Sequence, residues 1–207
     1  PAIQNKAGGT FSFTVGNCDR SIGARLSGEI AKIHGDLGMN DAPVTVNLTG
    51  TAGQSFGVWN AGGLNLTLEG DANDYVGKGL SGATITVRPS MTSPLKAEEN
   101  TIIGNTVLYG ATDGYLYASG RAGERFAVRN SGAKVVVEGC GSNGCEYMTG
   151  GMAVILGRIG ANFGAGMTGG MAYVYDPDGV AEDAMNTETI LTCGLGHPHW
   201  EAQLKDL

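Results

Sequence analysis

Residues 149–175 read TGGMAVILGRIGANFGAGMTGGMAYVY, and this stretch contains one short unit twice. The apolar runs 152–156 and 171–175 each begin two residues after a glycine, Gly150 and Gly169. The intervening GRIGANFGAGMTGG is too long for the two-residue turn of a β-hairpin, and it carries apolar positions of its own. The repeat therefore predicts successive coils of a parallel β-solenoid, in which equivalent strands stack in register.

The same signal recurs upstream. The glycines that precede an apolar run are Gly62, Gly82, Gly132, Gly150 and Gly169, at intervals of 20, 50, 18 and 19 residues. The interval of 50 fits between two and three periods with an insertion. Residues 44–176 have room for about seven coils, which predicts an all-β fold, a parallel β-helix. We expect these structural glycines at the corners, where they supply positive φ angles or close backbone approach.

Both ends of the chain differ from the repeat. Segment 1–43 predicts a capping helix with Asp19 as N-cap and an end at Gly35. The apolar face of that helix consists of Ile22, Leu26, Ile30 and Ile33. Segment 177–207 regains helical character over 200–207, and we interpret it as a docking tail for a partner. Residues 1–207 therefore form a single domain of three parts.

Composition narrows the function. The chain has 13 Lys plus Arg against 20 Asp plus Glu, a net charge of −7, so we expect neither nucleic acid nor a membrane surface as partner. No apolar stretch reaches the roughly 18 residues of a membrane span. Pro1 in place of Met indicates a piece excised from a longer protein. Few, irregularly spaced cysteines indicate reduced thiols and a cytoplasmic location.

Two stretches, 77–82 and 164–169, match the G-x-G-x-x-G pattern of dinucleotide-binding sites. Both run into another predicted strand and not into a helix, so we interpret them as coil corners. Asp71, Asn73 and Asp74 lack the spacing of a calcium loop, which favours turn capping.

The remaining motifs favour packing over catalysis. Cys140 and Cys145 have no second pair for zinc, and Cys193, His197 and His199 have no evident fourth ligand. We therefore expect no metal, no cofactor and no catalytic residue in this chain. An acyl-transfer triad is not supported either, because His34 is the one histidine outside the tail.

The most polar stretch is 121–132, RAGERFAVRNSG. Its charged residues are Arg121, Glu124, Arg125 and Arg129. Such a cluster can grip an anion, or it can form ion pairs and contact a partner across stacked coils. We favour the structural or interface use, and a shallow anion site remains the alternative.

Several long stretches resemble one known family. They are NCDRSIGARLSGEI (17–30), GQSFG (53–57), GDANDYVGKGLSG (70–82), IGNT (103–106), LYGAT (108–112), 121–132, and GCEYMTGG (144–151). In this order they resemble the C-terminal GXGXG domain of the glutamate synthase large chain, over roughly residues 12–188. The resemblance implies a right-handed parallel β-helix. Cys140 and Ser142 depart from the family pattern, where an aliphatic residue and an acid are usual.

The resemblance also implies a role. In that family a glutaminase (amidotransferase) domain releases ammonia to a synthase domain that carries FMN and an iron–sulfur cluster, reduced by NAD(P)H or ferredoxin. The GXGXG domain resembles a scaffold between these partners, so the chain is expected in a homo- or hetero-oligomer. A subunit of a related modular amidotransferase or oxidoreductase, such as the β-helical subunit of formylmethanofuran dehydrogenase, is the alternative.

Overall fold

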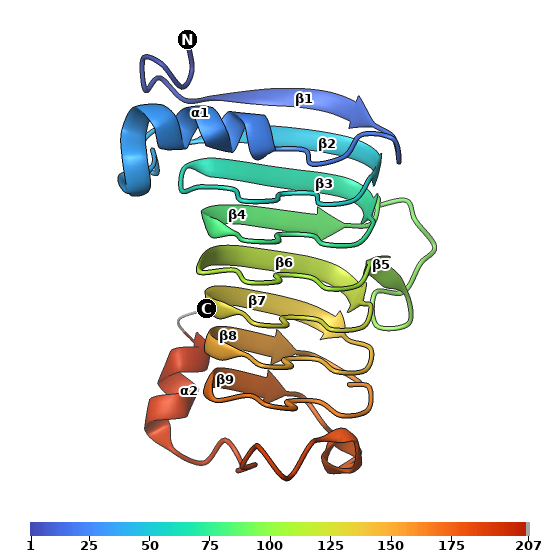
Figure 1. Ribbon diagram of the computed structural model, residues 1–207. Helices are drawn as coiled ribbons and strands as arrows, with labels where there is room; N and C mark the ends of the chain where they lie inside the picture. Colours follow the sequence, from blue (N-terminus) through green and yellow to red (C-terminus); the bar gives the residue numbers. More distant parts are fainter. Residues whose placement is uncertain (206–207) are drawn as a thin grey trace.

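The chain folds into a column of stacked coils (Figure 1). A computed structural model describes residues 1–205. Its strands are β1 (Gly9–Val15), β2 (Val44–Ala52), β3 (Leu64–Ala72), β4 (Ser81–Arg88), β5 (Thr101–Ile103), β6 (Asp113–Ala122), β7 (Ser131–Gly139), β8 (Thr149–Ile155) and β9 (Gly169–Val174). They pair in the order β1-β2-β3-β4-β6-β7-β8-β9, and every pairing is parallel. The predicted β-solenoid of about seven turns is confirmed.

Inward-facing aliphatic residues form continuous rows through the column. Leu66 lies beside Ile85, Ile85 beside Leu116, and Leu116 beside Val135 in the strand register. These side chains are at most 1% exposed, and the alternate residues of each strand face outward. Each coil therefore buries its apolar face only by stacking on its neighbours, as a solenoid requires.

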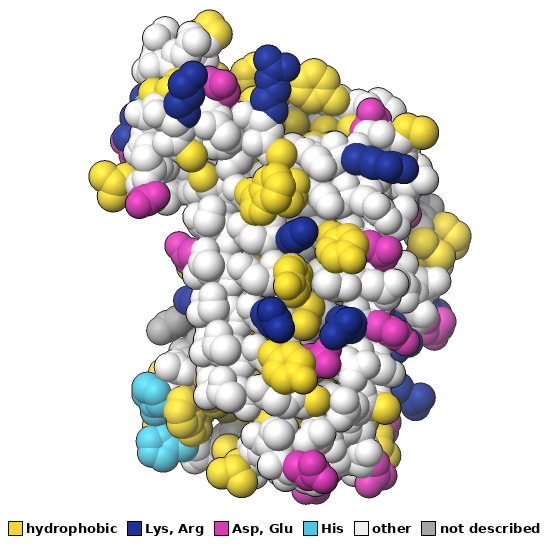
Figure 2. All heavy atoms as spheres, in the orientation of Figure 1, with side chains coloured by type: hydrophobic (Ala, Val, Ile, Leu, Met, Phe, Trp, Pro, Cys, Tyr) yellow, Lys and Arg dark blue, Asp and Glu magenta, His cyan; other side chains and the backbone are white. Residues whose placement is uncertain are grey.

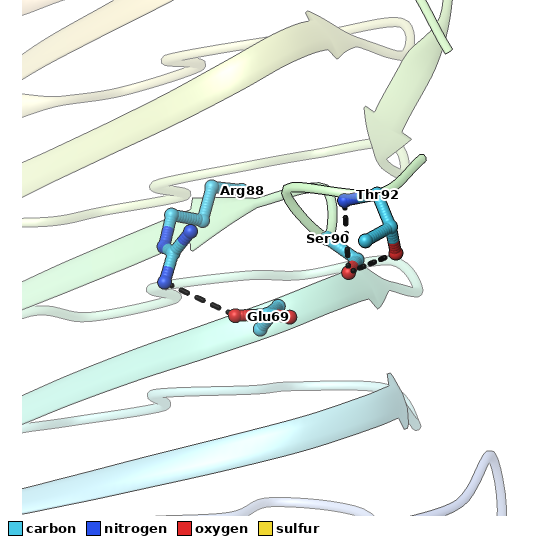
Figure 3. A network of polar contacts seen from close by, with 4 residues as sticks. All are labelled: Glu69, Arg88, Ser90 and Thr92. Carbon is cyan, nitrogen blue, oxygen red and sulfur yellow. Dashed lines mark hydrogen bonds and ion pairs between the residues drawn. The ribbon is translucent and has the colours of Figure 1, made fainter. Parts of the chain in front are cut away.

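The long interval between Gly82 and Gly132 holds one complete coil and an insertion. Strand β6 lies within it, and the chain between β4 and β5 leaves the column as a loop (Figure 1). Short β5 returns to pair with β3 and β6. At the base of the loop, Arg88 Nη2 donates to Glu69 Oε2 of the preceding coil at 3.1 Å, and Ser90 and Thr92 bond to each other (Figure 3).

From β2 onward, each coil returns opposite the strands through a segment that is neither helix nor strand. Three residues in each segment, two apart, have positive φ. They are Ser55, Gly57 and Trp59; Tyr75, Gly77 and Gly79; Thr106, Leu108 and Gly110; Arg125, Ala127 and Arg129; Asn143, Cys145 and Tyr147; and Asn162, Gly164 and Gly166. We call this side of the column the left-handed leg.

Backbone hydrogen bonds join the left-handed leg to both neighbouring coils. The outer residues of a triplet donate to the following coil: Arg125 N to Ser142 O and Arg129 N to Glu146 O, both at 2.9 Å. The middle residue donates backward, as Ala127 N does to Val107 O at 2.9 Å. The leg thus has a ladder of its own, which satisfies backbone groups that would otherwise lie unpaired beside the core.

A helix near the N-terminus is found as predicted: α1 (Ala24–His34) lies between β1 and β2 in the chain and packs beside the first coils (Figure 1). Ile30 is fully buried, and the Ser27 hydroxyl donates to Trp59 O and accepts from Ala61 N. The predicted N-cap is wrong: the helix begins after Gly23, whose φ of 94° lets the chain turn, and Asp19 instead accepts from Gly16 N in the preceding turn. A short 3-10 helix, Gly35–Leu37, follows α1.

The column also begins earlier than predicted. Strand β1 pairs with β2 along its whole length, so coils start at Gly9 and not at Val44. The GTFSFTV sequence alternates as a strand should, but Phe11 and Phe13 are 43% and 59% exposed because no further coil covers them.

The tail packs on the other end of the column. Asn186 N donates to Phe163 O of the last coil at 2.8 Å, and the Tyr173 hydroxyl contacts Trp200 O at 3.5 Å. The tail contains a 3-10 helix, Ala181–Ala184, and helix α2 (Pro198–Lys205). The predicted helix over 200–207 is thus found up to Lys205, and its last two residues lie outside the described ones. Within residues 1–205, no helix has both the length and the apolar character needed to cross a bilayer.

Candidate docking surface

The five structural glycines lie where the left-handed leg passes into a strand. Only Gly82 has a positive φ, 126°. A Cβ atom on Gly132, Gly150 or Gly169 would instead collide with a backbone oxygen of the preceding coil, and at Gly62 it would come 3.0 Å from Asn40 Nδ2. Close approach of stacked coils, and not φ, is therefore what most of these positions require.

The predicted charged cluster is spread around a corner. Arg121 lies at the end of β6, paired in register with Gly139 of β7. Glu124 belongs to the corner, where its amide donates to Asn105 Oδ1 at 2.8 Å. Arg125 and Arg129 follow on the left-handed leg at φ 57° and 53°. The structure thus places only these last two arginines on one face.

Arg125 is already partnered. Its Nε and Nη2 both lie 2.9 Å from Glu146 Oε2 of the next coil, and the Glu146 side chain is only 14% exposed. An arginine that is paired with a largely buried carboxylate is poorly placed to bind a free anion. For Arg129, none of residues 1–205 supplies an ion-pair partner.

Sequence reasoning missed the aromatic residues that share this face. Trp59, Tyr75 and Tyr147 occupy outer positions of the left-handed leg and are 61%, 38% and 50% exposed. Lys78 Nζ lies 5.7 Å from the ring centre of Tyr75 and 5.9 Å from that of Tyr109, within cation–π range. The positive-φ residues of each segment are two apart, but the three aromatic residues do not all occupy the same position of that pattern. The available signal therefore cannot be recognised without the coil register.

Together these side chains form what we call the aromatic–basic face. It consists of Trp59, Tyr75, Lys78, Tyr109, Arg129 and Tyr147. Figure 2 shows yellow hydrophobic and dark blue basic side chains gathered down the middle of the molecule. Two shallow hollows lie elsewhere: one of about 290 Å³ under the insertion, lined by Pro89, Leu95 and Lys96 among others, and one of about 210 Å³ beside Thr51 and Ile103.

The glycine motifs and the acidic turn have structural positions. Gly77, Gly79, Gly164 and Gly166 belong to the left-handed leg, and β4 or β9 follows each pair. They lie within the return segment and not at its corners as predicted. In the acidic turn, Asn73 Oδ1 accepts from Asp74 N, which is the local capping predicted. The two carboxylates instead join coils: Asp74 Oδ1 accepts from Asn105 N and Asp71 Oδ1 accepts from Thr51 Oγ1.

The cysteines are free and scattered. Cys140 and Cys145 are buried in the column, and burial raises the pKa of the Cys140 thiol to about 12 and that of Cys145 well above its usual value. Cys18 and Cys193 are exposed, in the first turn and in the tail. These four thiols are not gathered as iron–sulfur ligands. Within the part of the chain that the structure describes, no three His, Cys, Asp or Glu side chains form a metal-binding group.

The three histidines make contacts within the terminal segments of the chain. His34 Nε2 lies 2.8 Å from Ile3 O and fastens the N-terminal segment to α1. His197 and His199 stack edge to face in the tail, with ring centres 6.4 Å apart. These contacts give the three histidines places in the two terminal segments of the chain.

Comparison with known proteins identifies the family. The family model described as "GXGXG motif" matches residues 1–207. The NADPH glutamate synthase large chain of Azospirillum brasilense is 60% identical over 197 residues, and the ferredoxin-dependent glutamate synthase 2 of Synechocystis is 51% identical over 206. These matches cover 95% and 100% of this chain but 13% of each relative. An NADH glutamate synthase of Schizosaccharomyces pombe is 58% identical over 174 residues, 84% of this chain and 8% of that protein. The chain therefore belongs to the GXGXG family, and the relatives that it matches over most of its length are glutamate synthases.

Proposed function

We propose that this chain is the non-catalytic scaffold of a glutamate synthase large chain. Its column holds the glutaminase domain and the FMN and iron–sulfur synthase domain at a fixed separation, so that ammonia released by one reaches the other. The observation that carries the proposal is the column itself. Its backbone polar groups are largely hydrogen-bonded between neighbouring coils, and the thiols of Cys140 and Cys145 are buried and neutral.

The relatives' names support a role that is independent of the electron donor. They specify NADPH, ferredoxin or NADH, yet each protein contains a segment 51–60% identical to this chain. A segment that handled the reductant would be expected to differ more among them. We therefore assign FMN, the iron–sulfur cluster and the reductant site to the partner domains, and glutamate synthesis to the assembled protein in the cytoplasm.

The experiment that tests this role changes the length of the column. Deleting residues 152–170 from the full-length large chain joins Gly151 to Met171, which is the register partner of Met152. One coil is lost and the column shortens by one strand spacing, about 4.8 Å. Glutamine hydrolysis and ammonia-dependent glutamate synthesis should persist, because each needs only its own domain. Glutamine-dependent synthesis should fall about tenfold or more, a loss of about 1.4 kcal/mol in coupling.

Lys96→Ala in the exposed insertion serves as the control and should leave all three activities unchanged, since this side chain is 65% exposed. Full glutamine-dependent synthesis by the coil-deleted protein would overturn the scaffold role.

A further inference from the structure

The aromatic–basic face holds large side chains in a backbone conformation that suits glycine. Trp59, Tyr75 and Tyr147 have φ of 56°, 64° and 54°, in the left-handed region. Trp59 and Tyr147 are the third residues of their triplets, where other coils have Gly79, Gly110 and Gly166. Since glycine enters this region freely, the large residues make the coils harder to form. Other non-glycine residues of the left-handed leg share this conformation, so what distinguishes Trp59, Tyr75 and Tyr147 is that each combines it with a large exposed ring.

The rings are also fixed in place before any partner arrives. Trp59 lies against Gly79 of the next coil, and Tyr147 lies against Gly166; a Cβ atom at either glycine would meet the ring. Each ring has one side on the column, and half or more of its residue remains exposed. Rigid aromatic residues of this kind lose little entropy on binding, and Trp, Tyr and Arg are the residues that most often dominate binding energy at interfaces.

The charge of the face is opposite to that of the whole chain. The net charge is −7, yet this face carries Lys78 and Arg129. The nearby carboxylate of Glu146 is paired with Arg125. Among residues 1–205, neither Lys78 nor Arg129 has a carboxylate partner within ion-pair distance. A basic, aromatic strip on an acidic protein is complementary to an acidic surface.

We propose that the aromatic–basic face is a permanent interface for a carboxylate-rich surface of another domain of the same large chain. This rests on the proposed scaffold function and specifies where on the column it operates. The face extends over several coils and the two hollows lie elsewhere, which fits a protein surface better than a small ligand. In the relatives, about seven-eighths of the length lies outside the matching segment. Other domains of the same chain are therefore available as a covalently linked partner.

The test places a photo-reactive phenylalanine analogue, p-benzoylphenylalanine, at position 147 of the full-length large chain. After irradiation and digestion, mass spectrometry should find position 147 joined to a peptide outside this segment, in a stretch rich in Asp or Glu. The matched control is position 115, because Tyr115 is 37% exposed, lies on the outer face of β6 and has Lys134 above its ring. Its yield of such links should be several-fold lower.

Charge reversal supplies a second measurement. Arg129→Glu should reduce the yield from position 147 several-fold, whereas Lys134→Glu on the sheet side should not. Links from position 147 that stay within this segment, or that match the control in yield, would overturn the proposal. If that happens while the coil deletion still uncouples glutamine-dependent synthesis, the scaffold function stands and only its placement is wrong. If the coil deletion also has no effect, both fail.

Discussion

At the scale of single residues, the glycines have two different structural roles, and the sequence alone does not distinguish which glycine has which role. In the left-handed leg, glycine supplies positive φ, as at Gly77 with 64°. At the entrance to the strands, Gly150 has no such angle but lies directly against Ser131 O of the preceding coil. Both kinds read as one signal in the sequence, which is why corners and positive φ were expected together.

The close approach of Gly150 to the preceding coil predicts a change in stability when this glycine is replaced. Gly150→Ala should lower the free energy of unfolding by about 1–3 kcal/mol, because its Cβ must push one coil away from the next. Gly28→Ala is the matched control: it lies in α1 with open space around it, and should raise stability by about 0.5–1 kcal/mol. Urea unfolding followed by circular dichroism measures both. Equal midpoints would show that the coils do not pack as closely as described.

Cys140 predicts how stability responds to alkali. Burial raises its pKa from 9.0 to about 12, so the unfolded chain loses a proton above pH 9 that the folded chain keeps. Folding stability should therefore fall as pH rises from 9 to 12, by at most about 1.4 kcal/mol per pH unit from this thiol.

Cys140→Ala should make that decline shallower, whereas Cys193→Ala, at an exposed thiol, should not. Urea midpoints at a series of pH values measure the slopes. Parallel slopes for the original chain and Cys140→Ala would contradict the burial of this thiol in the folded state.

At the scale of elements, periodicity predicted the strands well because stacking imposes it. The expected runs 152–156 and 171–175 fall on β8 and β9, apart from the single end residues Leu156 and Tyr175. Strand β1 was not predicted because it belongs to the terminal coil. Phe11 and Phe13 stay exposed there, and no coil packs on the other side of this strand to require a buried apolar run. The left-handed leg was not predicted because its regularity lies in its φ angles. Glycine, asparagine, tyrosine and arginine all adopt positive φ here, so no residue type marks the leg in the sequence.

The same reasoning explains the site. Arg125 and Arg129 could be predicted as neighbours on one coil, but their separation from Arg121 depends on where the corner falls. Contacts between coils were out of reach, since the Arg125–Glu146 pair and the Lys78–Tyr109 contact join residues 21 and 31 positions apart. Only the strand register brings such residues together.

Helix α1 predicts a local weak point. Ser27 is 3% exposed and bridges α1 to the first left-handed segment through Trp59 O and Ala61 N. Ser27→Ala leaves both backbone groups without this partner and should cost about 1–3 kcal/mol. Ser90→Ala, in the exposed insertion, should cost close to nothing. Thermal unfolding compares the two, and a similar loss in both would show that α1 is not anchored through Ser27.

At the scale of the whole molecule, nearest-neighbour stacking gives a column that is stiff along its axis. Strand β1 forms one end of the column and the tail packs on the other, so partners are left with the long sides and the open edge of β1. Such a shape suits a spacer between domains, and the aromatic–basic face gives one of its sides a definite partner.

The structure of the full-length large chain by electron cryo-microscopy tests the scaffold role most directly. We expect one orientation of the column in every particle class, touching two other domains, with the surface around Trp59 and Tyr147 covered. A column that swings on a tether among classes, or density for a flavin or an iron–sulfur cluster within residues 1–205, would contradict this account.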